Sequence, residues 1–127
     1  MNALGIVRQV TVHQVEGRIE HCVPKTFQGS SALEYANLWL QLISERAPAD
    51  GSYYKTEVEV VFADGTTART RHKVKRGDTD GTVMEHMIRW AEYVLARADL
   101  HLLTPEEETS MRCILANAQA AREKEVE

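Results

Sequence analysis

The sequence has few cysteines, prolines and glycines, and each shortage excludes a class of protein. Its 127 residues include two cysteines, Cys22 and Cys113, which are far apart and outside any Cys-x-x-Cys spacing, so neither a disulfide framework nor a zinc ribbon is expected. Three prolines and seven glycines exclude a collagen-like chain. No apolar run approaches the roughly 20 residues that cross a bilayer, and the N-terminus lacks the pattern of a signal peptide. The sequence therefore predicts one compact cytoplasmic domain with no membrane contact.

The chain also lacks a basic excess, because 15 basic residues stand against 19 acidic ones and the net charge is −4. This balance disfavours general nucleic-acid binding, in which affinity depends on neutralised phosphates. One basic stretch holds the candidate nucleic-acid contacts, which are Arg69, Arg71, Lys73, Lys75 and Arg76. No aromatic residue alternates with these bases to stack on a single strand, so we interpret the stretch as a solvated strand balanced by Glu57 and Glu59.

Alternating apolar and polar residues predict an N-terminal hairpin, with strands at 6–12 and 18–23 and a turn at Glu16-Gly17. A two-residue loop sets the register of this hairpin. The register pairs Val10 with Val23, Val12 with His21 and His13 with Glu20.

A helix over about 32–46 is predicted next. Ser31 and Glu34 have the spacing of a capping box, and Pro48 disfavours helix in the residue before it. The residues expected to face the core recur at three- and four-residue spacing, and they are Leu33, Tyr35, Leu38, Trp39, Leu42 and Ile43.

The segment 53–76 predicts a second hairpin whose register is selected by apolar pattern and charge together. A three-residue loop at 63–65, with Gly65 left-handed, puts apolar residues on one face and opposite charges on the other. A two-residue loop would mix charge into the apolar face and is rejected. The predicted pairs are Phe62–Thr66, Val60–Ala68, Val58–Thr70, Tyr54–Val74, Glu59–Arg69 and Glu57–Arg71.

Two helices are predicted to end the chain. A capping box at Thr82 and Glu85 opens the first, and Thr104 with Pro105 opens the second. The second helix is expected to fray from Ala120 to the end, where apolar residues run out. The residues expected to be buried are Val83, Met84, Met87, Ile88, Ala91, Val94, Leu95 and Ala98 in the first helix and Met111, Ile114, Leu115 and Ala118 in the second.

The predicted fold is α+β, an antiparallel sheet of about four strands with three helices in the order ββαββαα. The helices are expected on one face of the sheet, and the other face is expected to be wet and charged. A single domain spans 1–127, with an N-terminal hairpin at 1–25, a helix-hairpin-two-helix unit at 30–122 and a frayed tail at 120–127.

No catalytic or metal-binding pattern stands out, and we expect no catalytic residue, metal or cofactor. The histidines lack the spacing of a zinc site, and Asp78 and Asp80 are interpreted as turn residues rather than cation ligands. His21 and Cys22 are strand neighbours that point to opposite faces, so a thiol-imidazole pair would need His13 or His72 instead. The five histidines are His13, His21, His72, His86 and His101.

A second stripe on the predicted helix after Thr82 is the candidate protein-binding site. It combines Trp, Tyr and Arg, the residues enriched at interface hot spots, and acidic residues lie near its far end. The equally weighted alternative is that a neighbouring helix covers Trp90. The candidate residues are His86, Trp90, Tyr93, Arg97, Asp99, Glu106, Glu107 and Glu108.

The portion from Trp39 to about Leu115 resembles a family of small domains of unknown function found on phages and conjugative elements, often attached to large polyvalent proteins. The resemblance covers about three-fifths of the chain and implies a mobile-element setting without an activity. The matching segments are the Ala47-Pro48 helix end, the strand from Gly51 to Val60, the turn from Phe62 to Gly65, Lys75 to Gly77, and Leu103 to Glu106.

We therefore expect a non-enzymatic, protein-binding accessory protein of a mobile element, present in the cytoplasm of a bacterial host. The leading hypothesis is an inhibitor of a host defence effector, similar to an anti-CRISPR protein, which acts by occlusion. The alternative is a nucleic-acid-binding factor of phage or plasmid DNA processing that uses the strand at 69–76. The sequence leaves the oligomeric state open, a dimer included.

Overall fold

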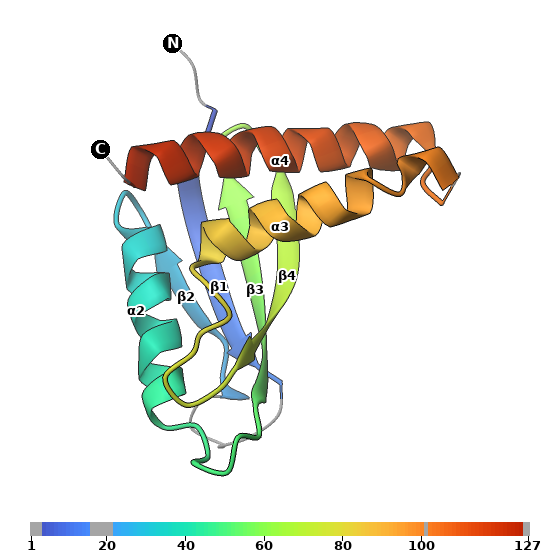
Figure 1. The fold of residues 1–127 in the computed structure, drawn as a ribbon. Helices are drawn as coiled ribbons and strands as arrows, with labels where there is room; N and C mark the ends of the chain where they lie inside the picture. Colours follow the sequence, from blue (N-terminus) through green and yellow to red (C-terminus); the bar gives the residue numbers. More distant parts are fainter. Residues whose placement is uncertain (1–3, 16–21, 101, 126–127) are drawn as a thin grey trace.

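The computed structural model describes residues 4–15, 22–100 and 102–125, in which one four-stranded antiparallel sheet has the strand order β2-β1-β3-β4 (Figure 1). The predicted α+β class and the order ββαββαα are confirmed. The elements are β1 (Val7–Gln14), β2 (Lys25–Gln28), α2 (Ala32–Glu45), β3 (Tyr54–Phe62), β4 (Thr67–Val74), α3 (Val83–Leu95), the 3₁₀ turn η1 (Ala98–Leu100) and α4 (Pro105–Glu125).

The β3–β4 hairpin has the predicted register. Phe62 donates its N–H to the Thr66 carbonyl at 2.8 Å, and Gly65 is left-handed with φ of 90°. Val58 lies opposite Thr70 and is fully buried, as the apolar pattern requires. The charged pairs Glu59–Arg69 and Glu57–Arg71 also face each other as predicted. Burial of the apolar face drives this pairing, and the charges fix its register.

The predicted register of the N-terminal hairpin is wrong. Val10 lies opposite Phe27 rather than Val23, because β2 begins at Lys25, after Pro24. The half-buried Phe27 packs against the core, whereas Val23 is 66% exposed. The turn at Glu16-Gly17 and the partners His21 and Glu20 lie outside the described residues.

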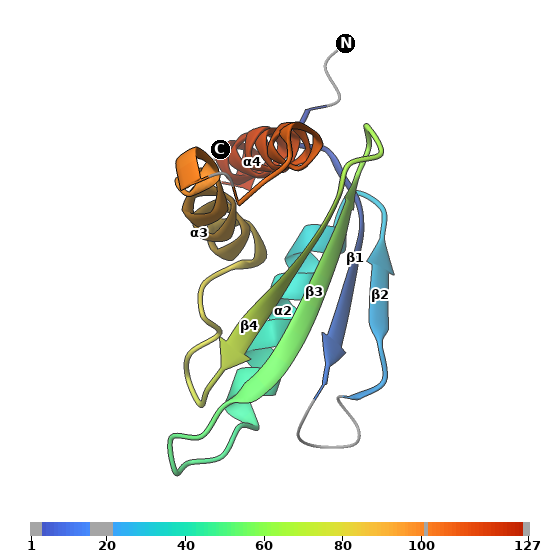
Figure 2. The same cartoon turned by 90° about the vertical axis from the view of Figure 1, so that its right-hand side faces the viewer.

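The three α-helices of the described residues cover one face of the sheet (Figure 2). α2 runs beside the strands, whereas α3 and α4 cross one end of them (Figure 1). β4 alternates exposed and buried residues over its whole length, so its even-numbered residues enter the core and its odd-numbered ones reach solvent. The uncovered face carries the charged pairs of β3 and β4.

α2 has the predicted bounds, but its start and its buried face differ from expectation. Ser31 makes no side-chain capping bond, because its ψ of 8° is far from the extended value that a capping residue needs. Tyr35 and Leu38, expected in the core, are 54% and 52% exposed. Ile43 is buried as predicted, and the other buried apolar residues of α2 are Ala32, Ala36 and Leu40, of which the two alanines allow a close approach.

The other two helices begin as predicted. Thr82 and Glu85 form a complete capping box at the start of α3. The buried residues of α3 are Val83, Met84, Met87 and Ala91, and the later members of the predicted stripe are only half-buried. α4 stays helical through Glu125, farther than the loss of apolar residues suggested, and its Ala121 is buried.

Candidate functional site

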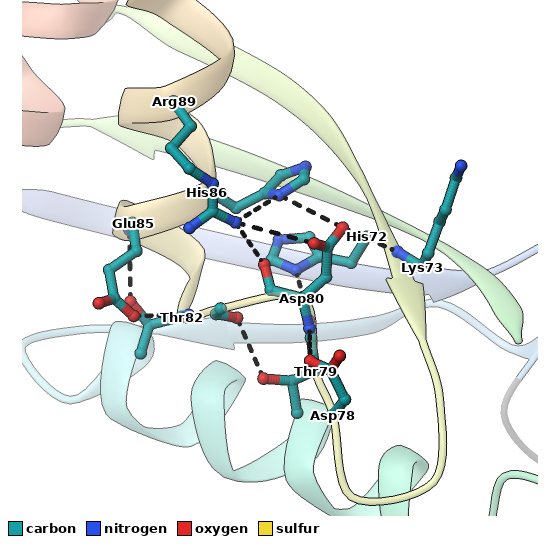
Figure 3. A network of polar contacts seen from close by, with 10 residues as sticks. His72, Lys73, Asp78, Thr79, Asp80, Thr82, Glu85, His86 and Arg89 are labelled. Carbon is teal, nitrogen blue, oxygen red and sulfur yellow. Dashed lines mark hydrogen bonds and ion pairs between the residues drawn. The ribbon is translucent and has the colours of Figure 1, made fainter. Parts of the chain in front are cut away.

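A network of polar contacts joins β4, the following loop and α3, and sequence reasoning missed it (Figure 3). Its centre is His72, which the alternation of β4 places on the covered face, where it is fully buried. His72 Nδ1 lies 3.0 Å from the carbonyl oxygen of Thr79, and because a carbonyl only accepts, the nitrogen donates. Nε2 is then the acceptor, and it has no hydrogen-bond partner within the described part of the chain.

The His72 ring is stacked on a second imidazole. The ring centroids of His72 and His86 are 4.2 Å apart, and the planes are tilted by 33°. Burial, with a smaller contribution from His86, lowers the pKa of His72 to about 4. His72 is therefore neutral at ordinary pH.

Asp80 closes the network from the loop. It adopts a left-handed φ of 64°, which places one carboxylate oxygen 3.2 Å from the Lys73 backbone N–H and 3.5 Å from His86 Nδ1. Arg89 donates to the Asp80 carbonyl at 2.8 Å. Asp78 in turn accepts from the Asp80 N–H at 2.8 Å, which is the turn role expected of it. The network therefore fixes the loop and the start of α3 to the edge of the sheet.

The structure does not bring the predicted α3 stripe together as one surface. The side chain of His86 is only 17% exposed because it belongs to the network. Trp90 is half-buried and packs against the core, which favours the alternative that neighbouring residues cover it. Tyr93 is 59% exposed, and the Arg97 guanidinium lies 3.6 Å from the centre of its ring. Of this stripe, Tyr93 and Arg97 remain available to a partner.

The acidic residues near the far end of α3 differ in what they do. Glu107 forms a reciprocal cap with Thr104, through bonds of 3.0 and 3.1 Å. Glu108 pairs with Arg112 at 2.6 Å, and Glu106 is exposed. The side chain of Asp99 lies outside the described part of the structure.

Two exposed leucines at this end were missed by the sequence analysis. Leu100 and Leu102 are 61% and 67% exposed, and no periodic pattern marks them because they lie between two helices. The junction of α3 and α4 lies beyond the edge of the sheet (Figure 1). We call this end of the molecule the arm tip, defined by Tyr93, Arg97, Leu100, Leu102 and Glu106.

Two of the five predicted contacts on the basic strand are neutralised by carboxylates. Arg69 and Arg71 pair with Glu59 and Glu57, each at 2.8 Å. The Lys73 ammonium lies 5.4 Å from the centre of the Tyr53 ring, an aromatic neighbour that the sequence pattern did not reveal. The remaining predicted contacts, Lys75 and Arg76, are exposed.

Neither a metal cluster nor a thiol-imidazole contact is found among the described residues. No group of three or more His, Cys, Asp or Glu side chains is placed to hold a metal ion in this part of the chain. Cys22 and Cys113 are both free thiols, and His21 and His101 lie outside the described residues. His13 lies half-buried on β1, lining a hollow of about 290 Å³ with Glu57, Glu59 and others.

Comparison of the sequence with protein-family models gave no match, and comparisons with the curated proteins and with the solved structures gave none either. No helix in the described residues is both long and apolar enough to span a bilayer.

Proposed function

We propose that this chain acts by binding another protein, and that the arm tip is the contact surface. The observation that carries the proposal is the exposure of three large apolar side chains within ten residues: Tyr93, Leu100 and Leu102 are each more than half exposed. Exposed apolar side chains that gather in one place, with polar residues around them, are typical of protein interaction sites. Tyr and Arg, which stack here, are also enriched among residues that dominate binding energy.

The charge around the arm tip favours a basic partner. The first turn of α4 carries Glu106, Glu107 and Glu108 directly after Leu102. Of these, Glu106 has no ion pair or hydrogen bond among the described residues, so its charge is available to a partner. A basic surface that normally holds nucleic acid has the matching charge, and an acidic protein seated on it would exclude the nucleic acid.

The biological setting that we propose is counter-defence by a mobile element in a bacterial cell. Under this proposal the chain inhibits a host defence effector, as an anti-CRISPR protein does, by occupying its nucleic-acid or partner site. The setting is the one that the sequence resemblance implies, and the acidic, apolar arm tip is the observation that supports occlusion.

The test is capture of partners from a bacterial lysate by the tagged full-length chain, with quantification by mass spectrometry. The variant Tyr93→Ala/Leu102→Ser removes the apolar anchors, and Tyr35→Ala is the matched control because Tyr35 is 54% exposed on α2. We expect a nucleic-acid-binding protein to be captured, to be lost with the arm-tip variant and to be displaced by heparin. Identical captured sets from the wild type and the arm-tip variant would refute the arm tip as the contact.

The alternative, a nucleic-acid-binding factor acting through strand 69–76, predicts a different result. Gel shifts of duplex DNA at several salt concentrations would show a steep salt dependence that flattens when Lys73, Lys75 and Arg76 are neutralised. Because Arg69 and Arg71 already have carboxylate partners, we expect no specific shift at physiological salt.

A further inference from the structure

A groove lies at the opposite end of α4 from the arm tip. The start of β1, the first turns of α2 and the C-terminal end of α4 meet at one corner of the molecule (Figure 1). Between them is a hollow of about 600 Å³ that is open to solvent. We call it the α2–α4 groove, defined by Ile6, Leu33, Glu34, Leu38, Ala121 and Glu125.

One wall of the groove is held in place by the rest of the fold. The Gly5 N–H donates to Asn117 Oδ1 at 3.0 Å, and the Lys124 ammonium donates to the Leu4 carbonyl at 2.9 Å. Gly5 has a φ of 79°, and a Cβ there would lie only 2.6 Å from the Cβ of Ala120, so the segment touches α4. The groove is therefore formed before any ligand arrives, which lowers the entropic cost of binding.

The rims of the groove are apolar and uncovered. Ile6 of the segment before β1 and Leu38 of α2 both line it and are 46% and 52% exposed. Leu33, which also lines it, is half-buried and packs against the core. An occupant with apolar side chains would remove this surface from water, at a gain of about 25 cal/mol for each Å² covered.

The carboxylates that line the groove favour an occupant with positive charge. Glu34 and Glu125 both line it, and neither has a hydrogen bond or an ion pair within 4 Å among the described residues. Lys124 also lines it and keeps its positive charge while bonded to the Leu4 carbonyl, so the two carboxylates leave the lining with a net negative charge. Partial burial, with the charge of Glu85, raises the pKa of Glu125 despite the opposing effect of Arg122. A cation in the groove would relieve this electrostatic cost.

We propose that the α2–α4 groove binds a segment of a partner protein in which apolar side chains are flanked by arginine or lysine. The apolar side chains lie between Ile6 and Leu38, and the basic side chains reach Glu34 and Glu125. Because the groove is open to solvent, a segment of another chain can enter it, which an enclosed cavity would not allow. The groove is a second surface, separate from the arm tip, and does not depend on the function proposed above.

The test is a titration of the ¹⁵N-labelled full-length chain with three acetylated, amidated hexapeptides, followed by amide chemical shifts. The first peptide has central leucine and isoleucine flanked by arginine and lysine. In the second, glutamate replaces the basic residues, and in the third, serine replaces the apolar ones. We expect only the first to shift the signals of Ile6, Leu38 and Glu125 in a saturable way.

Substitutions in the groove separate the apolar contribution to peptide binding from the electrostatic one. We expect Leu38→Ser to weaken the first peptide about tenfold and Glu125→Gln about threefold. Glu123→Gln, an exposed charge outside the groove, and Leu102→Ser at the arm tip are the matched controls and should leave the affinity unchanged. The proposal fails if the acidic peptide binds equally well, if no peptide shifts these signals, or if the controls weaken binding as much as Glu125→Gln. The spectrum of each variant reports whether it is folded.

Discussion

The two halves of α4 have opposite surroundings on one continuous helix. In the C-terminal half, Asn117, Ala118 and Ala121 are buried against the rest of the fold. In the N-terminal half Ile114 is also buried, but residues 109, 110, 112 and 113 are exposed, and the junction with α3 lies beyond the edge of the sheet (Figure 1). The C-terminal half therefore contributes most of the buried positions of α4, whereas its first turns, before Met111, contribute none.

This difference teaches that recognition and folding can be altered separately in this chain. A side chain whose contacts are all with solvent can be replaced at little cost in stability, whereas a buried polar residue cannot. The arm tip is close to the first kind, because Tyr93 and Leu102 are more than half exposed and Tyr93 stacks on Arg97, which itself belongs to the arm tip. The second kind includes the buried part of α4 around Asn117, which we call the root of α4, and the polar network at the start of α3.

The largest effect is expected for Asn117→Ala at the root of α4. Asn117 accepts from the Gly5 N–H and donates to Asp64 Oδ2 and to the Cys113 carbonyl, each at 3.0 Å, so its loss leaves the buried Gly5 N–H unpaired and removes two further bonds. We expect the free energy of unfolding, measured by urea denaturation, to fall by about 3 kcal/mol. Gln119→Ala, exposed on the same helix, should change it by less than about 0.5 kcal/mol. Equal effects of the two substitutions would contradict the contrast between buried and exposed sites.

The second effect is a dependence of stability on pH that comes from His72. Its pKa of about 4 in the fold lies below the ordinary value of 6.5, so protons bind more tightly to the unfolded chain. Stability from this group is complete above pH 6.5 and falls as the pH is lowered towards 4, by up to roughly 3 kcal/mol. Thermal melts between pH 7 and pH 4 should show this loss.

A matched variant isolates the contribution of His72. We expect His72→Leu to flatten the pH profile between pH 6.5 and pH 4, whatever its effect on stability at pH 7. A profile unchanged by His72→Leu would show that other groups cause the acid sensitivity.

The sequence could predict those parts of the fold in which two independent signals agree. In the β3–β4 hairpin, burial of Val58 and pairing of Glu57 with Arg71 select the same register, and the structure has it. In the N-terminal hairpin only alternation was available, and alternation does not set loop length, so Val10 was paired with Val23 instead of Phe27. The capping-box spacing was right at Thr82 and wrong at Ser31, because spacing does not determine the backbone angles of the capping residue.

The candidate site was predictable only in part. Tyr93 and Arg97 were found from helical spacing, but Leu100 and Leu102 follow no period because they lie outside the long helices. The burial of His72 could have been predicted from the sequence. The correct register already placed Val74 on the covered face, and strand residues two apart share a face. Its contact with His86 depends on how α3 folds back on β4, which local pattern does not encode.

The third prediction concerns the arm tip. It compares the loss of stability on replacing its exposed residues with the loss expected at buried sites. For Tyr93→Ala/Leu102→Ser we expect the free energy of unfolding to change by less than about 0.5 kcal/mol, because both side chains are more than half exposed. Trp90→Ala, which removes a half-buried ring packed on the core, should cost about 2 kcal/mol or more. A large loss in the double variant would mean that the arm tip supports the fold, and its use as a contact surface would need another explanation.

The smallest change in the free energy of unfolding is expected when either of two arginines on α4 is replaced. Arg112 pairs with Glu108 one turn away in the exposed half, whereas Arg122 lies 3.5 Å from Glu85 on another helix. A pair within one exposed helix contributes about 0.3 kcal/mol, and a pair between elements contributes up to about 1 kcal/mol because it also opposes their separation. We therefore expect Arg122→Gln to lower the free energy of unfolding more than Arg112→Gln at low salt. In 1 M NaCl, urea denaturation should bring both variants close to the wild type, since screening weakens exposed pairs. A loss for Arg112→Gln that equals or exceeds that for Arg122→Gln would show that the two halves of α4 do not differ in how charge stabilises them.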